Sequence, residues 1–131
     1  MTSPEKGVFI MQEKRRSYRL PVEVPTSFKI FEEQSHLSLG LINEISALGY
    51  SFTTREFLSP GQELSMVVSF SDGQRLNLPV KVVWSRQESY VDTPEYFVGV
   101  KLLEPLTPET ARYIRVYVRY FLAAFMKTND E

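Results

Sequence analysis

The segment LSMVVSFSDGQRLNLPVKVVW, residues 64–84, decides the fold class, because apolar and polar residues alternate on both sides of a turn signal. The apolar positions are Leu64, Met66, Val68 and Phe70 before the turn, and Leu76, Leu78, Val80, Val82 and Trp84 after it. A period of two is typical of a strand with one face in a core. Asp72 and Gly73 tolerate positive φ, which favours a hairpin. The segment therefore predicts two antiparallel strands.

The same period continues in both directions along the chain. Further strands are expected through Phe28 and Ile30, through Leu37, Leu39 and Leu41, from Tyr50 to Thr54, and through Tyr96, Val98, Val100 and Leu102. Pro21 and Pro25 argue against a helix or a central strand before Thr26, so an extended lead-in segment is expected there. Six short strands with turn signals between them predict a small antiparallel barrel, because closure removes exposed edges.

The last part of the chain changes to a helical period. Thr107, Pro108 and Glu109 indicate a helix start, with an N-cap, a proline in the first position and an acid in the first turn. Apolar residues then recur at Ile114, Val118, Phe121 and Phe125. The predicted fold is mostly β: a six-stranded antiparallel β-barrel with a C-terminal α-helix.

Length and composition limit the function classes. The chain has 131 residues, a net charge of −1 and no cysteine, so one domain without disulfides or thiol chemistry is expected. A pI of about 5.9 argues against a DNA or RNA partner, which would favour a strongly basic domain. Neither a signal peptide nor a membrane span is evident, and a cytoplasmic location is expected.

Residues with catalytic or metal-binding chemistry are few. His36 is the single histidine, in a polar stretch that is expected to form a hairpin loop. No further ligands stand at a recognised metal-binding spacing, and no nucleophile motif, paired carboxylates or Gly-rich phosphate loop is found. We therefore expect no catalytic residue, no metal and no cofactor.

A basic cluster stands immediately before the first strand. Its members are Lys14, Arg15, Arg16 and Arg19. Guanidinium groups present forked donors to phosphate oxygens and to the edge of guanine, and their flat faces stack on bases. By itself the cluster is also explained by a solvated loop. The same Arg-x-x-x-Arg spacing recurs at Arg115 and Arg119, where outward-facing helix residues explain it.

A second motif lies between two predicted strands. Glu44, Ser46 and Gly49 follow the spacing acid-x-Ser-x-x-Gly. A short turn at this point can direct a carboxylate, a hydroxyl and backbone N–H groups to one place. We therefore expect this turn to form one side of a binding site.

In this order of elements, the two motifs resemble the PilZ domain, a bacterial receptor for the second messenger cyclic di-GMP. The similarity includes Val82-Val83-Trp84, Phe97-Val98-Gly99-Val100 and the terminal helix, and it extends from about Lys14 to Phe125. It implies a barrel of the split-barrel type whose surface binds one cyclic di-GMP or an intercalated pair. Residues 14–126 are expected to form this domain, with residues 1–13 as an N-terminal arm that can be flexible and residues 127–131 as a polar tail.

The resemblance also implies which residues bind the ligand. They are Arg15, Arg16, Arg19, Glu44, Ser46 and Gly49. In the family the arginines hold phosphates and contact guanine, and the second motif begins with Asp or Asn. Glu44 departs from that pattern. It has the same pair of acceptor oxygens as Asp but one more methylene, so it loses more side-chain entropy and weaker binding is expected.

Two functions remain open from the sequence. The first is a non-enzymatic cyclic di-GMP-binding signalling module, in which the Arg-x-x-x-Arg segment and the Glu-x-Ser-x-x-Gly turn clamp the ligand. The alternative is a degenerate PilZ-like adaptor that acts by protein–protein contact without nucleotide. The helix carries more aromatic residues than one face needs: Tyr113, Tyr117, Tyr120, Phe121 and Phe125. They either pack under the N-terminal arm or contact a protein partner or a second copy of the chain, and the sequence leaves both open. The other aromatics, Phe70, Trp84, Tyr96 and Phe97, are expected in the core or on the barrel surface.

Overall fold

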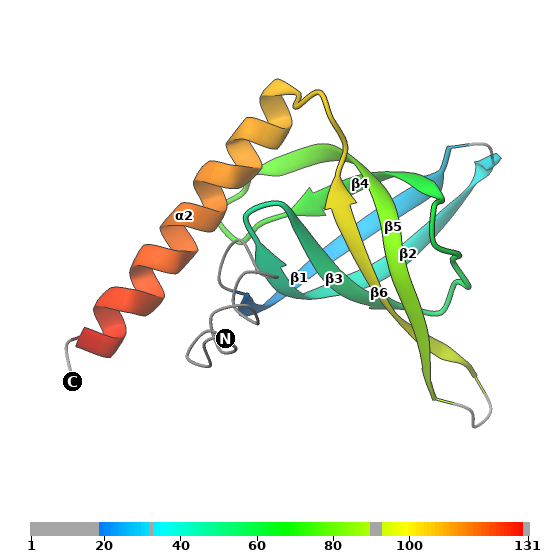
Figure 1. The fold of residues 1–131 in the computed structure, drawn as a ribbon, viewed down its shortest axis with the longest axis horizontal. Helices are drawn as coiled ribbons and strands as arrows, with labels where there is room; N and C mark the ends of the chain where they lie inside the picture. The colour runs from blue at the N-terminus through cyan, green and yellow to red at the C-terminus, as the bar shows by residue number, and fades with distance from the viewer. Residues whose placement is uncertain (1–18, 32, 90–92, 130–131) are drawn as a thin grey trace, which may run out of the picture.

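The computed structural model describes residues 19–31, 33–89 and 93–129. Six antiparallel strands close into a barrel in the order β1-β2-β3-β6-β5-β4, and helix α2 crosses one end of it (Figure 1). The elements are β1 (Leu20–Ile30), β2 (Glu33–Ser46), β3 (Gly49–Thr54), β4 (Glu63–Ser69), β5 (Arg75–Ser89), β6 (Glu95–Leu102) and α2 (Pro108–Asn129). The predicted fold class is confirmed.

Strand β1 contains the two prolines, so the extended segment that was expected before Thr26 is the first half of this strand. β1 pairs with β2 along its length, but it pairs with β4 only from Thr26 onward. The prolines therefore lie in the half of β1 that has a single neighbour. Proline cannot donate a hydrogen bond to a second neighbour, and a strand with one free side tolerates that loss.

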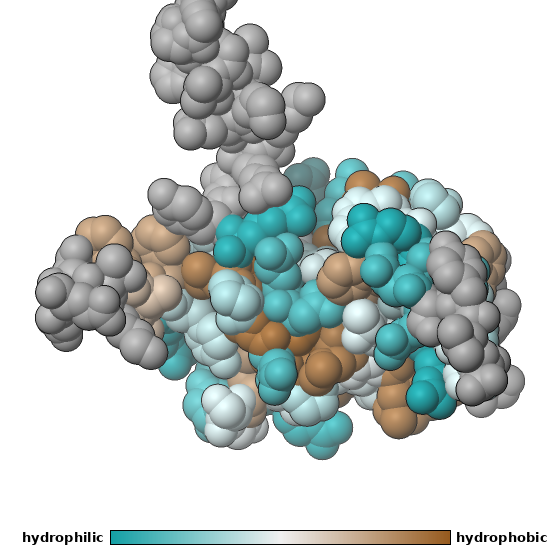
Figure 2. Space-filling view, turned by 90° about the horizontal axis from the view of Figure 1, so that it is seen from below, coloured by the Kyte–Doolittle hydropathy of each residue, from teal (hydrophilic) through white to brown (hydrophobic). Residues whose placement is uncertain are grey.

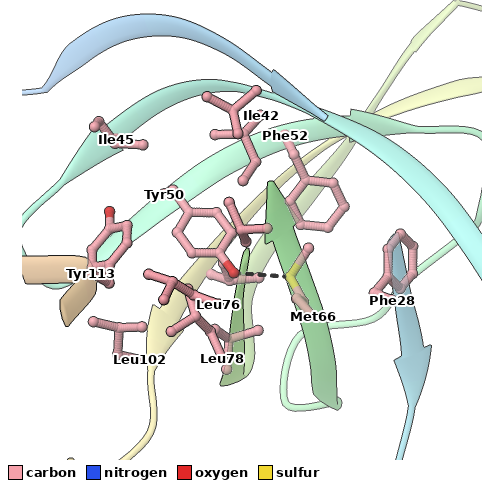
Figure 3. Close-up of a cluster of buried hydrophobic side chains, with 14 of the residues drawn as sticks. Phe28, Ile42, Ile45, Tyr50, Phe52, Met66, Leu76, Leu78, Leu102 and Tyr113 are labelled. Atoms are coloured by element: carbon pink, nitrogen blue, oxygen red, sulfur yellow. Dashed lines mark hydrogen bonds between the residues drawn. The ribbon is translucent and has the colours of Figure 1, made fainter. Parts of the chain in front are cut away.

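Side chains from all six strands fill the interior of the barrel (Figure 3). The predicted inward rows of β4 and β5 are buried from Leu64 to Val68 and from Leu76 to Val82, at alternate positions. The predicted row on β2 is different, because Leu37, Leu39 and Leu41 face outward and are between 42% and 72% exposed. His36, expected in a loop, lies on β2 as well, with Nε2 3.3 Å from Glu56 Oε1.

Helix α2 begins as its sequence predicts and docks on the barrel by its first half. The Thr107 hydroxyl accepts a hydrogen bond from the Thr110 N–H at 3.0 Å, which caps the helix. Tyr113 and Tyr117 are buried, so these two aromatics belong to the core and are not free for a partner. An ion pair between Arg119 and Asp72, at 3.7 Å, joins the helix to the β4–β5 hairpin.

The second half of α2 extends past the barrel (Figure 1). Its large apolar residues are exposed, with Phe125 at 54% and Met126 at 62%. Figure 2 shows hydrophobic residues gathered at this end of the helix. Within the described residues, no helix has the length and apolarity that crossing a membrane requires.

Candidate functional site

A cavity of about 330 Å³ opens on the outside of the barrel, where β2, β3, β5 and β6 lie beside the start of β1. Its lining residues are Arg19, Glu44, Ile45, Ser46, Leu48, Gly49, Tyr50, Ser51, Val83, Trp84, Gly99, Val100 and Lys101. Four of the six residues that the sequence predicts for a site are therefore brought together: Arg19, Glu44, Ser46 and Gly49. Arg15 and Arg16 lie outside the described residues.

Glu44 reaches this cavity because β2 is irregular at that point. Ile42 and Ile45 both face the core, although they are three positions apart on one strand. The pairing of β2 with β3 shifts between Ile42 and Glu44, as expected for a β-bulge. One extra residue exchanges the faces of all later side chains, so Glu44 and Ser46 face outward. The extra residue, Asn43, accepts a hydrogen bond from the Ser51 hydroxyl at 3.0 Å.

Glu44 and Arg19 form an ion pair, with 3.4 Å between Glu44 Oε1 and Arg19 Nη1. The two side chains are 39% and 40% exposed, so water screens their attraction. The two sequence motifs are thus in direct contact through one residue from each. The site offers a carboxylate and a guanidinium side by side, which matches a ligand that carries both N–H donors and an anion.

The turn between β2 and β3 is shorter than the predicted one, because Glu44 and Ser46 lie within β2 and not between the strands. β2 runs to Ser46 and β3 starts at Gly49, so Ala47 and Leu48 alone form the turn. Ser46 donates a hydrogen bond from its hydroxyl to the Gly49 carbonyl at 3.2 Å. A Cβ on residue 49 would stand 2.2 Å from the Val100 carbonyl oxygen of β6, so glycine is required by this close approach.

Tyr113 of α2 holds the same turn from inside the barrel. Its hydroxyl lies 2.6 Å from the Ser46 carbonyl oxygen and 2.8 Å from that of Gly49, and its single proton is donated between them. Burial, with a smaller contribution from nearby Tyr50, raises the pKa of Tyr113 well above its usual range. The phenol therefore stays protonated as a donor, and it ties the first half of α2 directly to the motif turn.

Trp84 forms part of the cavity wall, a position that sequence reasoning missed. The pairing of β5 with β6 shifts between Val82 and Trp84, and the indole lies over Gly99 on the outer face. A Cβ on residue 99 would come within 2.3 Å of the indole ring. The Arg86 guanidinium lies 5.6 Å from the Trp84 ring centroid, and Phe97 meets the ring edge-on. The sequence contains one signal for this position, which is a large aromatic residue, Trp84, and a glycine, Gly99, on two different strands. These strands, β5 and β6, are neighbours in the barrel.

A second, wider cavity of about 610 Å³ lies at the opposite end of β2 and β3. Its polar side chains already contact one another, because Glu56 Oε1 lies 3.3 Å from His36 Nε2 and 3.1 Å from Ser38 Oγ. It includes none of the predicted site residues. In the described part of the chain, no group of acidic or histidine residues has the arrangement of a metal site.

A barrel with a filled interior and a charged cavity on its outer face is the arrangement of a ligand-binding module. The chain belongs to the PilZ domain family, whose model matches residues 13–120. This family includes receptor domains for cyclic di-GMP. No curated protein matches the sequence.

Solved structures show the same fold at low sequence identity. The PilZ domain of Escherichia coli YcgR, determined with c-di-GMP, aligns with a TM-score of 0.66 at 12% identity, covering 90% of this chain and 98% of that one. The K. pneumonia MrkH–c-di-GMP complex gives 0.70 at 16% identity and covers 86% and 55%. Borreliella burgdorferi PlzA in complex with c-di-GMP gives 0.57 at 14% identity and covers 95% and 58%. The chain thus spans little more than half of the MrkH and PlzA chains.

Proposed function

We propose that this protein is a non-enzymatic signalling module that binds cyclic di-GMP in the outer cavity. The observation that supports the proposal is that Arg19, Glu44, Ser46 and Gly49, from separate parts of the chain, line one cavity. Membership of the PilZ family supplies the ligand class. The structures of YcgR, MrkH and PlzA named above contain that ligand.

The cavity offers a partner for each part of the ligand. Guanine presents N1–H and N2–H₂ donors, and the Glu44 carboxylate is an acceptor for both. The Arg19 guanidinium suits a phosphate, as does that of Arg15, the other arginine of the family motif, with Arg16 beside it. Trp84 provides an aromatic surface on which a base can stack. In this proposal the bound ligand breaks the exposed ion pair between Arg19 and Glu44 and becomes the new partner of each side chain.

The test is a calorimetric titration of the whole chain with cyclic di-GMP at moderate salt. The wild type is expected to bind with a Kd on the order of micromolar. Arg19→Ala is expected to weaken binding at least about tenfold, because a charge-assisted contact to phosphate is lost. Arg115→Ala is the matched control, since Arg115 has the same spacing motif but lies exposed on α2. No heat and no thermal shift from the wild type at high ligand excess would overturn the proposal.

A second candidate function is an adaptor that contacts another protein through the projecting half of α2. The observation that favours it is the exposure of Leu122, Phe125 and Met126 beyond the barrel. Phe125→Asp should abolish such a contact and leave the cyclic di-GMP titration unchanged, because the cavity lies elsewhere. Sedimentation of the wild type as a monomer at all concentrations, with no partner captured, would remove this candidate.

A further inference from the structure

We infer that Lys101 is an additional anion-binding residue of the outer cavity and contacts a phosphate of the bound dinucleotide. The inference rests on the proposed function, and it assigns a role to a residue that belongs to neither sequence motif. It follows from the position of Lys101, from the balance of charge in the cavity and from the pairing of β5 with β6.

The position of Lys101 follows from the alternation of β6. Val100 and Leu102 are buried, so Lys101 between them faces outward, where it is exposed. In the pairing of β3 with β6 it stands opposite Gly49. Gly49 has no side chain to cover this place, and both residues line the cavity. A ligand seated over the Gly49 backbone is therefore within reach of the long, flexible Lys101 side chain.

The charges that line the cavity do not balance. They are Arg19, Glu44 and Lys101. Arg19 and Glu44 neutralise each other in an ion pair at 3.4 Å. Lys101 forms no ion pair with any residue that the structure describes. The cavity thus retains one positive charge that an anionic ligand can neutralise.

The neighbour of Lys101 on the other side is a second lysine. Lys81 of β5 stands directly opposite Lys101, and the buried Val80 and Val82 show that it faces outward as well. Like charges at directly opposite positions of an antiparallel pair destabilise the sheet. Glu63 of β4 stands opposite Lys81 on its far side, and so it is nearer to Lys81 than to Lys101. A phosphate beside Lys101 would relieve this repulsion.

These observations predict that removing the Lys101 charge changes binding and stability in opposite directions. Lys101→Met keeps the apolar stem, removes the repulsion from Lys81 and removes the phosphate contact. Its melting temperature should equal or exceed that of the wild type, while its affinity for cyclic di-GMP should be weaker by roughly threefold to tenfold. A lysine with a merely structural role would not separate these two quantities in this way.

The experiment is a titration of wild type, Lys101→Met, Lys101→Arg and Lys29→Met with cyclic di-GMP at several salt concentrations. Lys101→Arg keeps the positive charge, so it should bind cyclic di-GMP about as tightly as the wild type. Lys29→Met is the matched control, because Lys29 is exposed on β1 and lies outside the cavity. The plot of log K against log salt should be shallower for Lys101→Met than for the wild type, because one charge–charge contact that salt screens has been removed. Titrations with GMP and with inorganic phosphate show whether the residue serves the dinucleotide or any small anion.

The outcomes separate the two proposals. If the wild type binds and Lys101→Met matches it in affinity and salt slope, the role of Lys101 is overturned and the proposed function stands. If inorganic phosphate binds as tightly as cyclic di-GMP and depends equally on Lys101, the residue is a general anion site and the assignment to the dinucleotide is wrong. If the wild type shows no binding of cyclic di-GMP, both proposals are wrong.

Discussion

Arg19 and Glu44 stand 25 positions apart in the chain, yet their side chains meet at 3.4 Å on the outer face of the barrel. One precedes β1 and the other follows the bulge of β2, and the pairing of these two strands brings them together. An exposed ion pair of this kind contributes at most about 1 kcal/mol, so a ligand can replace it at little cost. The pair therefore marks where the two motifs meet and leaves both groups available.

The length of the side chain at position 44 should control affinity. Glu44→Asp is expected to tighten cyclic di-GMP binding by roughly threefold to tenfold, because the shorter carboxylate loses less rotamer freedom. Glu44→Gln keeps the length but replaces one acceptor oxygen by a donor, so it should bind more weakly than the wild type. Calorimetric titration of the three proteins measures the order. An aspartate variant that binds no better than the wild type would show that the extra methylene is not a handicap.

The position of Trp84 should depend on the absence of a side chain at residue 99. Gly99→Ala places a methyl group within 2.3 Å of the indole, so Trp84 must leave its place in the cavity wall. Because Trp84 is the one tryptophan of the chain, its fluorescence reports this directly. We expect a red-shifted emission maximum and at least about tenfold weaker binding of cyclic di-GMP through loss of a stacking surface.

Gly73→Ala is the control for that substitution, because Gly73 lies in the β4–β5 hairpin and its added Cβ meets no atom within 4 Å. Alanine is disfavoured at the positive φ of 93° of residue 73, so Gly73→Ala should lower the free energy of unfolding without moving Trp84. Emission and affinity should remain those of the wild type. An unchanged emission maximum in Gly99→Ala would contradict the proposed packing.

Alkaline pH should destabilise the protein through its buried phenols. Burial raises the pKa of Tyr113 and of Tyr50 above the usual value, whereas the unfolded chain ionises at about pH 10. Below that pH neither state is ionised and the phenols add no pH dependence. Above it the unfolded state binds fewer protons than the folded state, so the free energy of unfolding falls as pH rises, by up to about 1.4 kcal/mol per unit for each phenol.

Urea unfolding between pH 7 and about pH 11.5 tests this effect in two variants. Tyr113→Phe and Tyr50→Phe should both fall less steeply than the wild type above about pH 10. At pH 7 they should differ, because the Tyr113 hydroxyl serves two backbone carbonyls and the Tyr50 hydroxyl faces the Met66 sulfur at 3.2 Å. We expect a loss of about 1–2 kcal/mol for Tyr113→Phe and less for Tyr50→Phe. Parallel pH profiles for all three proteins would refute the argument.

Much of the fold was accessible from local pattern. The inward rows of β4 and β5 follow the period of two around Asp72 and Gly73, and the cap at Thr107 starts α2 as expected. Local sequence pattern did not show that strand β1 begins as early as Leu20. Whether Pro21 can join a strand depends on how many neighbours that strand has, and this is settled by where β4 ends.

The sequence identified the residue types of the site and their spacing. It did not show that these residues line one surface. Glu44 and Trp84 each follow a shift in strand pairing, and these shifts turn both side chains toward the cavity. Lys101 has no motif to mark it, and Tyr113 contacts the turn from 64 positions away in the chain. None of these relationships is a property of one strand alone.

The sequence by itself determined the class of each element, the inward apolar rows of β4 and β5 and the two motifs, because alternation, capping and turn chemistry act between near neighbours in the chain. The tertiary structure alone decided which face Glu44 and Trp84 present and which strands lie beside Gly49. The physical reason is that a bulge is defined by a strand and its partner together, and one added residue exchanges every later side chain between core and solvent.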